Sequence, residues 1–296
     1  MNGKGENMPV VSMKELIKDA QKRKYAIGNH NTIDYEAVKG IILAAEEMNA
    51  PVIIGIAQSQ LEILPIDTLS CIFLLEAKKS KVPIAIHLDH GTSIQLIKKA
   101  IDLGFNSVMY DGSQLPFEDN ISNTIEVVQY AKSKNVAVEA EIGKMINIEN
   151  AKYNELSSSD SDKNDFTDPT IVGEFVERTK IDMLAVSYGS IHGLHAKKPM
   201  LNFDLLEQIH NTINIPLVLH GGSGLDASDY LKSINNGVHK INYYSFGYNA
   251  VAAEIKERIL FEKEPIFYHD ISNWPIEAFK NIFKETMIQF HSAGKA

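Results

Sequence analysis

The sequence predicts a single-domain α/β protein, a (β/α)₈ barrel of the TIM type that spans residues 1–296. Eight short apolar runs alternate with longer amphipathic segments, as expected of repeated strand–helix units. The runs are mostly β-branched and apolar throughout, which is typical of parallel strands buried on both faces. The chain length also fits, since such barrels typically take about 250 residues. An open, doubly wound sheet is the competing architecture.

The predicted strands are each four to six residues long, with room for one helix between neighbours. They span residues 25–28, 51–56, 83–88, 107–110, 136–141, 182–186, 216–220 and 238–242. The segments between them carry apolar residues at helical spacing and end near Asn or Gly, as residues 34–49 and 93–104 illustrate. Strict alternation over eight units favours the closed barrel.

Composition and charge exclude several classes of partner. The formal net charge of −9 argues against nonspecific binding to nucleic acid or anionic membranes, because both need a basic face. No stretch approaches the roughly 20 apolar residues of a membrane span, and the first residues lack the apolar run of a signal peptide. The single cysteine, Cys71, excludes an internal disulfide and is expected to be a core thiol on a helix. We therefore expect a cytoplasmic protein that binds neither nucleic acid nor membranes.

One irregular region stands out, at residues 143–168. It has no sustained period and contains the polar cluster "SSSDSDKND". A loop of this length inside a compact domain is usually an active-site lid or a disordered insertion. We keep it as a candidate active-site lid.

Polar residues stand at the carboxyl ends of most predicted strands. These ends meet at one rim of a (β/α)₈ barrel, where barrel enzymes carry their chemistry, so the side chains are candidates for one site. In chain order they are Asn31, Asp89, His90, Asp111, Glu141, His192, His220 and Asn242.

Three of these residues, His90, His192 and His220, stand beside glycine, which lets the backbone approach a ligand closely. One histidine near a strand end is more often structural, but three at the ends of different strands favour a shared cation. Three imidazoles that leave an open position describe a catalytic Zn²⁺ site. His87 lies an odd number of residues from His90, so strand alternation would turn it the other way, and we expect it to be structural.

Three carboxylates accompany the histidines. Asp89 adjoins His90 and could move a proton while zinc polarises a carbonyl. Asp111 and Glu141 either orient the imidazoles or form an alternative metal position. A turn residue in "YDGS" is an equal alternative for Asp111.

A glycine-rich stretch, "HGGSG" at residues 220–224, follows the seventh strand and precedes a helix that begins near Asp226. Its backbone N–H groups and its serine hydroxyl can bind an anion. Loops after the seventh and eighth strands are the usual phosphate site of this fold. We expect substrate or phosphate binding from Asn31, Gly221, Gly222, Ser223, Asn242 and Ser245.

These motifs resemble those of one family. In order along the chain, "AIHLDHGTS", "VMYDGSQLPFEDNI", "VEAEIG", "GSIHG", "PLVLHGGSG" and "KIN" are similar to motifs of the class II zinc-dependent ketose-bisphosphate aldolases, the fructose- and tagatose-bisphosphate enzymes. The resemblance runs from about Tyr25 through the eighth predicted strand and returns at the terminal "SAGKA".

The resemblance implies roles for the matching residues. Asp89 matches the general acid/base, Glu141 a carboxylate near the metal, and Glu149 a mobile-loop glutamate that takes part in proton transfer. The implied zinc ligands are His90, His192 and His220. The implied contacts of the dihydroxyacetone phosphate part are Gly193, Gly221, Ser223, Asn242 and Ser245. The family also implies a monovalent cation, Na⁺ or K⁺, near the phosphate and assembly into a homodimer or higher homo-oligomer.

The chemistry of the implied reaction agrees with these residues. Reversible cleavage of the C3–C4 bond of a ketose phosphate yields the enediolate of dihydroxyacetone phosphate and an aldehyde. That aldehyde is glyceraldehyde 3-phosphate where the substrate is fructose or tagatose bisphosphate. The enediolate charge needs an electrophile, which zinc supplies as a Lewis acid. No lysine stands at a matching strand end to form a Schiff base instead.

Two other functions stay open at this point. A noncatalytic sugar-phosphate-binding relative is favoured by the bulky Tyr243 and Tyr244, in a segment usually filled by small or polar residues. A metal-dependent hydrolase on the same barrel usually has an H-x-H pair on an early strand, which "AIGNHN" lacks. Asp89 favours the aldolase, because binding alone needs no proton transfer.

One departure from the family concerns the second phosphate. Ile276 stands where a family arginine is expected, and Lys197 or Lys198 could replace that arginine only as a point charge. None of the chain's arginines lies in a motif: Arg23, Arg178 and Arg258. The sequence therefore leads to the hypothesis that the aldehyde half of the substrate differs and lacks a phosphate.

Overall fold

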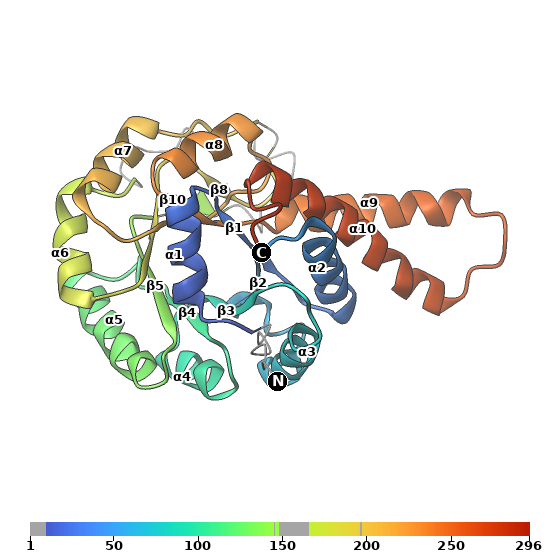
Figure 1. Cartoon of the computed structure of the whole chain (residues 1–296), viewed down its shortest axis with the longest axis horizontal. Coiled ribbons are helices and arrows are strands. Elements are labelled where there is room, and N and C mark those ends of the chain that lie inside the picture. The colour runs from blue at the N-terminus through green and yellow to red at the C-terminus, as the bar shows by residue number, and fades with distance from the viewer. Residues whose placement is uncertain (1–9, 145, 148–165, 196) are drawn as a thin grey trace, which may run out of the picture.

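The computed structural model describes residues 10–144, 146–147, 166–195 and 197–296, in which eight parallel strands close into a barrel surrounded by helices (Figure 1). The barrel strands are β1 (Ile27–Asn31), β2 (Val52–Ala57), β3 (Ile84–Gly91), β4 (Ser107–Tyr110), β5 (Ala137–Ile142), β7 (Met183–Val186), β9 (Leu217–Leu219) and β10 (Val238–Asn242). Around the barrel they follow the order β1, β10, β9, β7, β5, β4, β3 and β2. The predicted fold class is confirmed, and the open sheet is excluded.

A helix follows each barrel strand, and a further helix precedes β1. The helices are α1 (Met13–Arg23), α2 (Tyr35–Met48), α3 (Ile66–Ala77), α4 (Ile94–Asp102), α5 (Phe117–Lys132), α6 (Pro169–Thr179), α7 (Phe203–Thr212), α8 (Ala227–Asn235), α9 (Ser245–Phe261) and α10 (Tyr268–Gln289), with a 3₁₀ turn η1 (Gln58–Gln60). Side-chain caps start several of them. Asp34 caps α2 by accepting a hydrogen bond from the Ala37 N–H at 2.7 Å. In the described ranges no helix combines the length and apolarity that a membrane crossing needs.

The first strand lies further along the chain than its apolar run at residues 25–28. β1 includes Asn29 and Asn31, whose side chains are buried inside the barrel and joined by a hydrogen bond of 3.2 Å. Gly55 on β2 leaves room for both amides, because a Cβ there would collide with their Oδ1 atoms. Polar residues therefore continue the strand toward the carboxyl end of the barrel.

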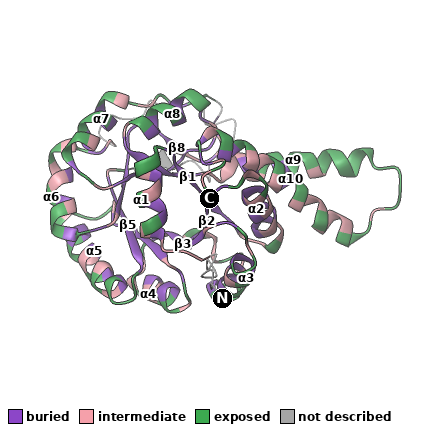
Figure 2. Cartoon of the chain, in the orientation of Figure 1, coloured by how far each residue is buried: buried purple, intermediate pink, exposed green. Residues whose placement is uncertain are grey.

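The apolar core has two parts. One lies between the barrel and the surrounding helices, whose inward faces are buried (Figure 2). The other fills the amino-terminal end of the barrel interior, where Met13, Leu16 and Ile17 of α1 pack with Ile27 and Ile53. Full burial of an aliphatic side chain stabilises a fold by about 1.5–3 kcal/mol. Because α1 closes this end, the barrel interior is accessible from the carboxyl ends of the strands.

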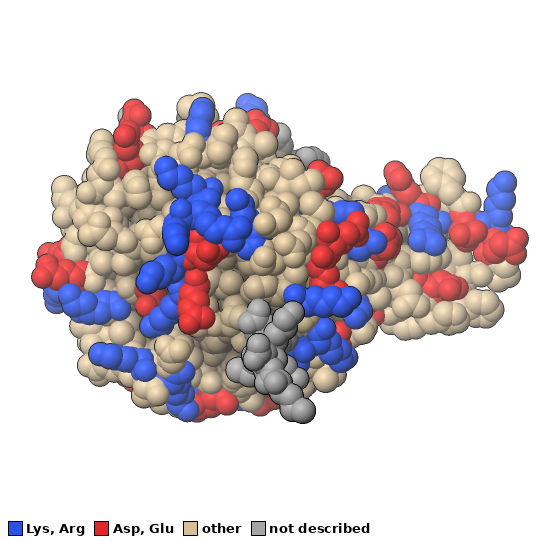
Figure 3. Space-filling model, in the orientation of Figure 1, with Lys and Arg blue, Asp and Glu red and all other residues tan. Residues whose placement is uncertain are grey.

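Helices α9 and α10 leave the barrel as a projecting arm (Figure 1). Gly40 lets α10 pack closely on α2, because a Cβ there would lie 2.6 Å from Phe279 Cβ and 2.7 Å from the Ile276 carbonyl oxygen. On the face shown in Figure 3, Lys and Arg are interspersed with Asp and Glu over the barrel, and the lower edge of the arm shows mainly other residues.

Cys71 is exposed on α3, so the expectation of a core thiol is wrong. The buried stripe of α3 includes Leu69, Phe73 and Ala77, which recur at helical spacing. Cys71 falls outside this stripe and faces solvent.

Most of the predicted lid at 143–168, including Glu149, lies outside the described residues. At its start, β6 (Ile146–Asn147) pairs in parallel with β8 (Ile191–His192). The expectation that the whole segment lacks regular structure is therefore wrong at this point. The register sets Asn147 opposite His192, so the pairing fixes the backbone of a predicted zinc ligand.

Candidate active site

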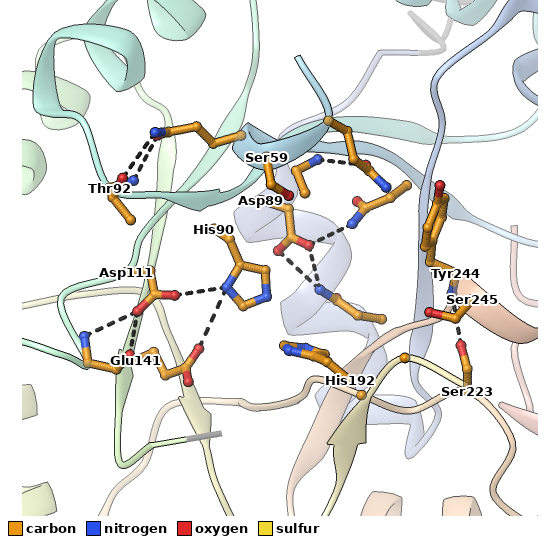
Figure 4. A pocket seen from close by; sticks show the side chains of 18 of the residues that line it. Ser59, Asp89, His90, Thr92, Asp111, Glu141, His192, Ser223, Tyr244 and Ser245 are labelled. Atoms are coloured by element: carbon orange, nitrogen blue, oxygen red, sulfur yellow. Dashed lines mark hydrogen bonds and ion pairs between the residues drawn. The ribbon is translucent and has the colours of Figure 1, made fainter. Parts of the chain in front are cut away.

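The carboxyl ends of the barrel strands surround a cavity of about 480 Å³ (Figure 4). Predicted site residues that line it are Asn31, Asp89, His90, Asp111, Glu141, His192, Gly193, Gly221, Ser223, Asn242 and Ser245. His220 contacts His90 from a fully buried position, and Gly222 follows Gly221 in the same loop. Lys197 is exposed and does not line the cavity.

The three predicted zinc ligands meet at this cavity. Their ring centroids are 4.9 Å apart for His90 and His192, 4.5 Å for His90 and His220, and 5.9 Å for His192 and His220. One ring nitrogen of each lies within 4.8 Å of the others. The spacing allows the three rings to share one metal ion.

His90 reaches the cavity because the backbone of β3 departs from a regular strand there. Its φ is +46°, in the left-handed region, and the pairing with β4 shifts between Leu88 and Gly91. The regular alternation of side chains along a strand therefore does not predict the direction of His87 from that of His90. His87 and Asp89 both point into the barrel, where His87 Nε2 lies 3.7 Å from Asp89 Oδ1. The prediction that His87 faces away from the site was wrong for this reason.

The contacts of His90 and His220 leave two ring nitrogens facing each other. His220 Nε2 lies 2.7 Å from Glu139 Oε1, and His90 Nδ1 lies 2.9 Å from Asp111 Oδ2. Both carboxyl groups have lowered pKa values and accept hydrogen bonds, so these two nitrogens carry protons. The opposite nitrogens, His220 Nδ1 and His90 Nε2, are 2.8 Å apart. Two ring nitrogens at this distance need either a shared proton between them or a metal ion that accepts both lone pairs. The residues therefore fit a divalent metal ion.

The surroundings also separate the pKa values of the histidines. Burial opposes a charge on His90, but nearby carboxylates, Asp89 above all, outweigh it and raise the pKa of His90 to about 10. Burial and then the charge of His90 hold the pKa of His192 well below its ordinary value and also lower that of His220. Positive charge is therefore concentrated at His90, and the other two rings are neutral donors of lone pairs.

Asp111 and Glu141 offer a second cation position beside His90. One atom from each of these three residues lies within 4.8 Å of the others. Glu141 Oε2 is buried without a hydrogen-bond partner, and burial and then Asp111 raise the pKa of Glu141 well above its usual value. Asp111 also accepts hydrogen bonds from the N–H and hydroxyl of Ser113, at 3.1 and 2.7 Å. Asp111 is thus both a turn residue and a partner of His90.

Asp89 is an ionised carboxylate beside the histidines. It is 1% exposed and accepts hydrogen bonds from Asn31 at 2.8 Å and from Asn242 at 3.0 Å to each oxygen. Burial opposes its charge, but the neighbouring imidazoles, first the positively charged His90 and then His220, hold the pKa of Asp89 well below its usual value. The two amides fix the carboxylate at the cavity, where it is available to take a proton (Figure 4).

Sequence reasoning missed a buried ion pair beneath the histidines. Lys240 Nζ lies 2.8 Å from Glu139 Oε2, and both side chains are 0% exposed. Lys240 Nζ also lies 3.3 Å from His87 Nε2. The sequence held a signal, because Glu139 stands two residues before Glu141 and Lys240 two before Asn242, so strand alternation turns both into the barrel.

The loops after β9 and β10 form a candidate anion site. Gly221 and Gly224 have φ values of +60° and +81°, and Ser223 Oγ accepts a hydrogen bond from the Tyr244 N–H at 2.9 Å. Helix α9 begins at Ser245, so its unpaired N–H groups and the positive end of its dipole lie at the same side of the cavity (Figure 4). Of the predicted phosphate-binding residues, Gly221, Ser223 and Ser245 are thus brought together at one side of the cavity.

Comparisons with known proteins give a consistent result. Residues 11–295 match the family model for class II fructose-bisphosphate aldolases. The fructose-bisphosphate aldolase of Staphylococcus aureus (strain Mu50 / ATCC 700699) is 37% identical over 293 residues, which cover 98% of this chain and 100% of that protein. The 6-phospho-5-dehydro-2-deoxy-D-gluconate aldolase of Halalkalibacterium halodurans is 37% identical over 292 residues, which cover 98% of this chain and 99% of that protein. The solved YdjI aldolase from Escherichia coli K12 matches with a TM-score of 0.85 and 32% identity, over 97% of this chain and 99% of that one.

Proposed function

The chain belongs to the class II fructose-bisphosphate aldolase family, and on that premise we propose that it uses zinc to cleave a ketose phosphate reversibly into dihydroxyacetone phosphate and an aldehyde. One observation carries the proposal. One ring nitrogen from each of His90, His192 and His220 lies within 4.8 Å of the other two, beside the ionised Asp89. A protein that only binds a sugar phosphate has no use for a carboxylate poised to take a proton.

Zinc is the metal that this donor set favours. Three imidazoles leave a fourth position for the substrate, and two of the rings are oriented by Glu139 and Asp111. When bound, zinc supplies a Lewis acid that stabilises the negative charge developing on the enediolate of dihydroxyacetone phosphate.

Asp89 carries the proton transfer at the bond that breaks. During cleavage it accepts the proton of the C4 hydroxyl group, the C3–C4 electron pair stays on C3, and the aldehyde forms at C4. In condensation Asp89 returns this proton to the C4 oxygen. Asn31 and Asn242 hold the carboxylate in position through three hydrogen bonds. The role of Glu149 in proton transfer stays a prediction.

The phosphate of the three-carbon half belongs in the nest formed by residues 221–224 and the start of α9. Backbone N–H groups of this loop and of the first turn of α9, with the Ser223 hydroxyl, bind the phosphate there, since no lysine or arginine is among the described residues that line the cavity. A monovalent cation, Na⁺ or K⁺, near this phosphate stays a prediction.

Metal analysis and chelation test the proposed function. The purified protein is expected to hold about one zinc ion per chain, to release dihydroxyacetone phosphate from a ketose phosphate, and to lose this activity in EDTA and regain it with zinc. Varying Na⁺ and K⁺ in the same assay tests the monovalent cation. Turnover that survives complete removal of metal would contradict the proposal. Zinc binding without turnover would support a noncatalytic sugar-phosphate binder instead.

The relatives leave the aldehyde half of the substrate open. Two of them, both 37% identical to this chain, are named for different substrates, fructose bisphosphate and 6-phospho-5-dehydro-2-deoxy-D-gluconate. Activity on fructose or tagatose bisphosphate and a role in glycolysis therefore stay predictions. A cytoplasmic location also stays a prediction, which the single cysteine favours.

We also propose a homodimer or a higher homo-oligomer formed through the arm. Four apolar side chains near its tip are 61–85% exposed: Leu260, Phe261, Phe267 and Tyr268. An apolar groove of about 680 Å³ runs along α9 and α10 beside the start of α2. Because the exposed tip and the groove belong to the same arm, the tip of each copy can enter the groove of the other. Such a contact is self-complementary and has two-fold symmetry. Light scattering should give at least a dimer for the wild type and a smaller species for Phe261→Lys; a monomeric wild type would contradict this assembly.

A further inference from the structure

The cavity has a second end, across the barrel from the phosphate nest. In the closed order of strands, β9 stands four places from β3, and β10 stands four places from β4. The histidines and Asp89 lie between these two sides (Figure 4). A ketose phosphate with its phosphate in the nest and its reacting carbons at the histidines therefore directs its remaining carbons toward the loops after β2, β3 and β4. We call this side the far end.

The described residues of the far end are polar but include no lysine or arginine. Its lining includes five amide or hydroxyl side chains and one carboxylate: Gln58, Gln60, Thr92, Ser113, Gln114 and Glu62. Among the described residues that line the cavity, none is a lysine or an arginine. A phosphate group is usually bound by such cations or by free backbone N–H groups.

Three backbone N–H groups at the far end, those of Thr92, Ser93 and Ser113, already have acceptors. Gln58 Oε1 accepts hydrogen bonds from the N–H groups of Thr92 and Ser93, at 2.8 and 3.2 Å, just before α4 begins. The Ser113 N–H donates to Asp111 Oδ1 at 3.1 Å. These donors are not available to an anion, so the far end does not repeat the nest after β9 and β10.

The arginines are engaged elsewhere. Arg178 forms ion pairs with carboxylates of α5 and α6 at 2.6 and 2.8 Å, and Arg23 forms one at 3.1 Å. Arg258 lies over the ring of Trp274 on the arm, 4.3 Å from its centroid. Lys198 is held by two carboxylates at the start of α8. In the described part of the chain, none of these four side chains therefore lies at the far end.

We propose that the far end binds an uncharged, hydroxyl-bearing chain, so that the substrate is a ketose with one phosphate, on the carbon next to its keto group. The aldehyde product then carries no phosphate. The side chains of Gln60, Thr92 and Gln114 can both donate hydrogen bonds to sugar hydroxyls and accept them. Glu62 adds a negative charge that disfavours a second phosphate. This inference rests on the proposed function, because it needs the phosphate nest and the histidines to fix the other half of the substrate.

Matched pairs of aldehydes test the inference in the direction of condensation. The zinc-loaded full chain receives dihydroxyacetone phosphate with glyceraldehyde or glyceraldehyde 3-phosphate, and with erythrose or erythrose 4-phosphate. Within each pair the two aldehydes differ only in the phosphate. We expect kcat/KM to favour the uncharged aldehyde by about tenfold or more. An equal or higher kcat/KM for the phosphorylated aldehyde in either pair overturns the inference.

Hydrogen exchange at C3 of dihydroxyacetone phosphate separates this inference from the proposed function. The exchange, followed by NMR in D₂O, needs enediolate formation but no aldehyde. Exchange together with a preference for phosphorylated aldehydes rejects the inference alone. Absence of both exchange and condensation rejects the proposed function, and the inference falls with it.

Two substitutions at Glu62 give a matched test of the charge at the far end. The residue is exposed, so Glu62→Lys and Glu62→Gln are expected to fold. Glu62→Lys should raise kcat/KM for glyceraldehyde 3-phosphate relative to glyceraldehyde by about tenfold, and Glu62→Gln by less. An unchanged ratio in Glu62→Lys would mean that the aldehyde does not lie near this residue, and the assignment of the far end would be wrong.

Discussion

The Asp89→Asn variant is expected to cleave its substrate about 10²–10⁴-fold more slowly than the wild type, which is the range that general acid–base groups contribute. Asparagine keeps the size of the side chain but cannot take the C4 hydroxyl proton. The loss should appear in kcat, with little change in KM, because Asp89 acts on the reacting hydroxyl and the phosphate nest lies elsewhere. Steady-state kinetics with the zinc-loaded variant measure both constants.

Two controls identify the cause of that loss. Zinc content should stay at about one ion per chain, because the proposed ligands are the three histidines. Asn31→Ala removes one hydrogen bond of 2.8 Å to Asp89 but leaves those from Asn242, so its kcat should fall less. If Asp89→Asn loses zinc together with activity, Asp89 supports the metal site, and another group must carry the proton.

The barrel could be predicted because most of its strands are apolar on both faces. Ile84, Ala85 and Ile86 of β3 are all wholly buried, and such runs stand out against the amphipathic helices. β1 shows the limit of this signal. Asn29 and Asn31 lie inside the barrel at the level of the site, so hydropathy ends the strand too early.

The sequence predicts the site residues that stand at the carboxyl ends of strands. The direction of the side chains of β3 could not be predicted, because His90 has a left-handed backbone, at φ +46°, which is uncommon for any residue other than glycine. The pairing of β6 with β8 was also hidden, since two residues are too short for a periodic pattern. The alternation of side chains along a strand turns Glu139 and Lys240 into the barrel. Each stands two residues before a more evident candidate at the strand end, Glu141 and Asn242 respectively.

Glu139→Gln is expected to weaken zinc binding by about 10–100-fold, as measured by competition with a chromophoric chelator. Glu139 Oε1 lies 2.7 Å from His220 Nε2, which keeps the ring proton on that nitrogen and leaves Nδ1 free to bind a metal. A glutamine can donate its own N–H to the ring instead. His220 could then carry its proton on Nδ1, on the side where the lone pair is needed.

The same substitution breaks a buried ion pair, which gives a second route to weaker binding. Lys240 lies 2.8 Å from Glu139, and leaving its charge unpaired inside the barrel costs about 3–5 kcal/mol of folding free energy. The double variant Glu139→Gln/Lys240→Met removes both charges. Its free energy of unfolding, measured in urea, should therefore exceed that of Glu139→Gln.

Zinc affinity in the double variant separates the two routes. If Glu139 sets the proton position on His220, affinity stays about 10–100-fold weaker although stability returns. Lys240→Met alone keeps the contact between Glu139 and His220 but removes the charge that most lowers the pKa of Glu139, so its zinc affinity should fall less than that of Glu139→Gln. If zinc affinity recovers in the double variant, Glu139 acts only as the counter-ion of Lys240. The His220 proton would then stay on Nε2 without the Glu139 carboxylate, because Asn242 Nδ2, 3.2 Å from His220 Nδ1, can only donate a hydrogen bond to that nitrogen.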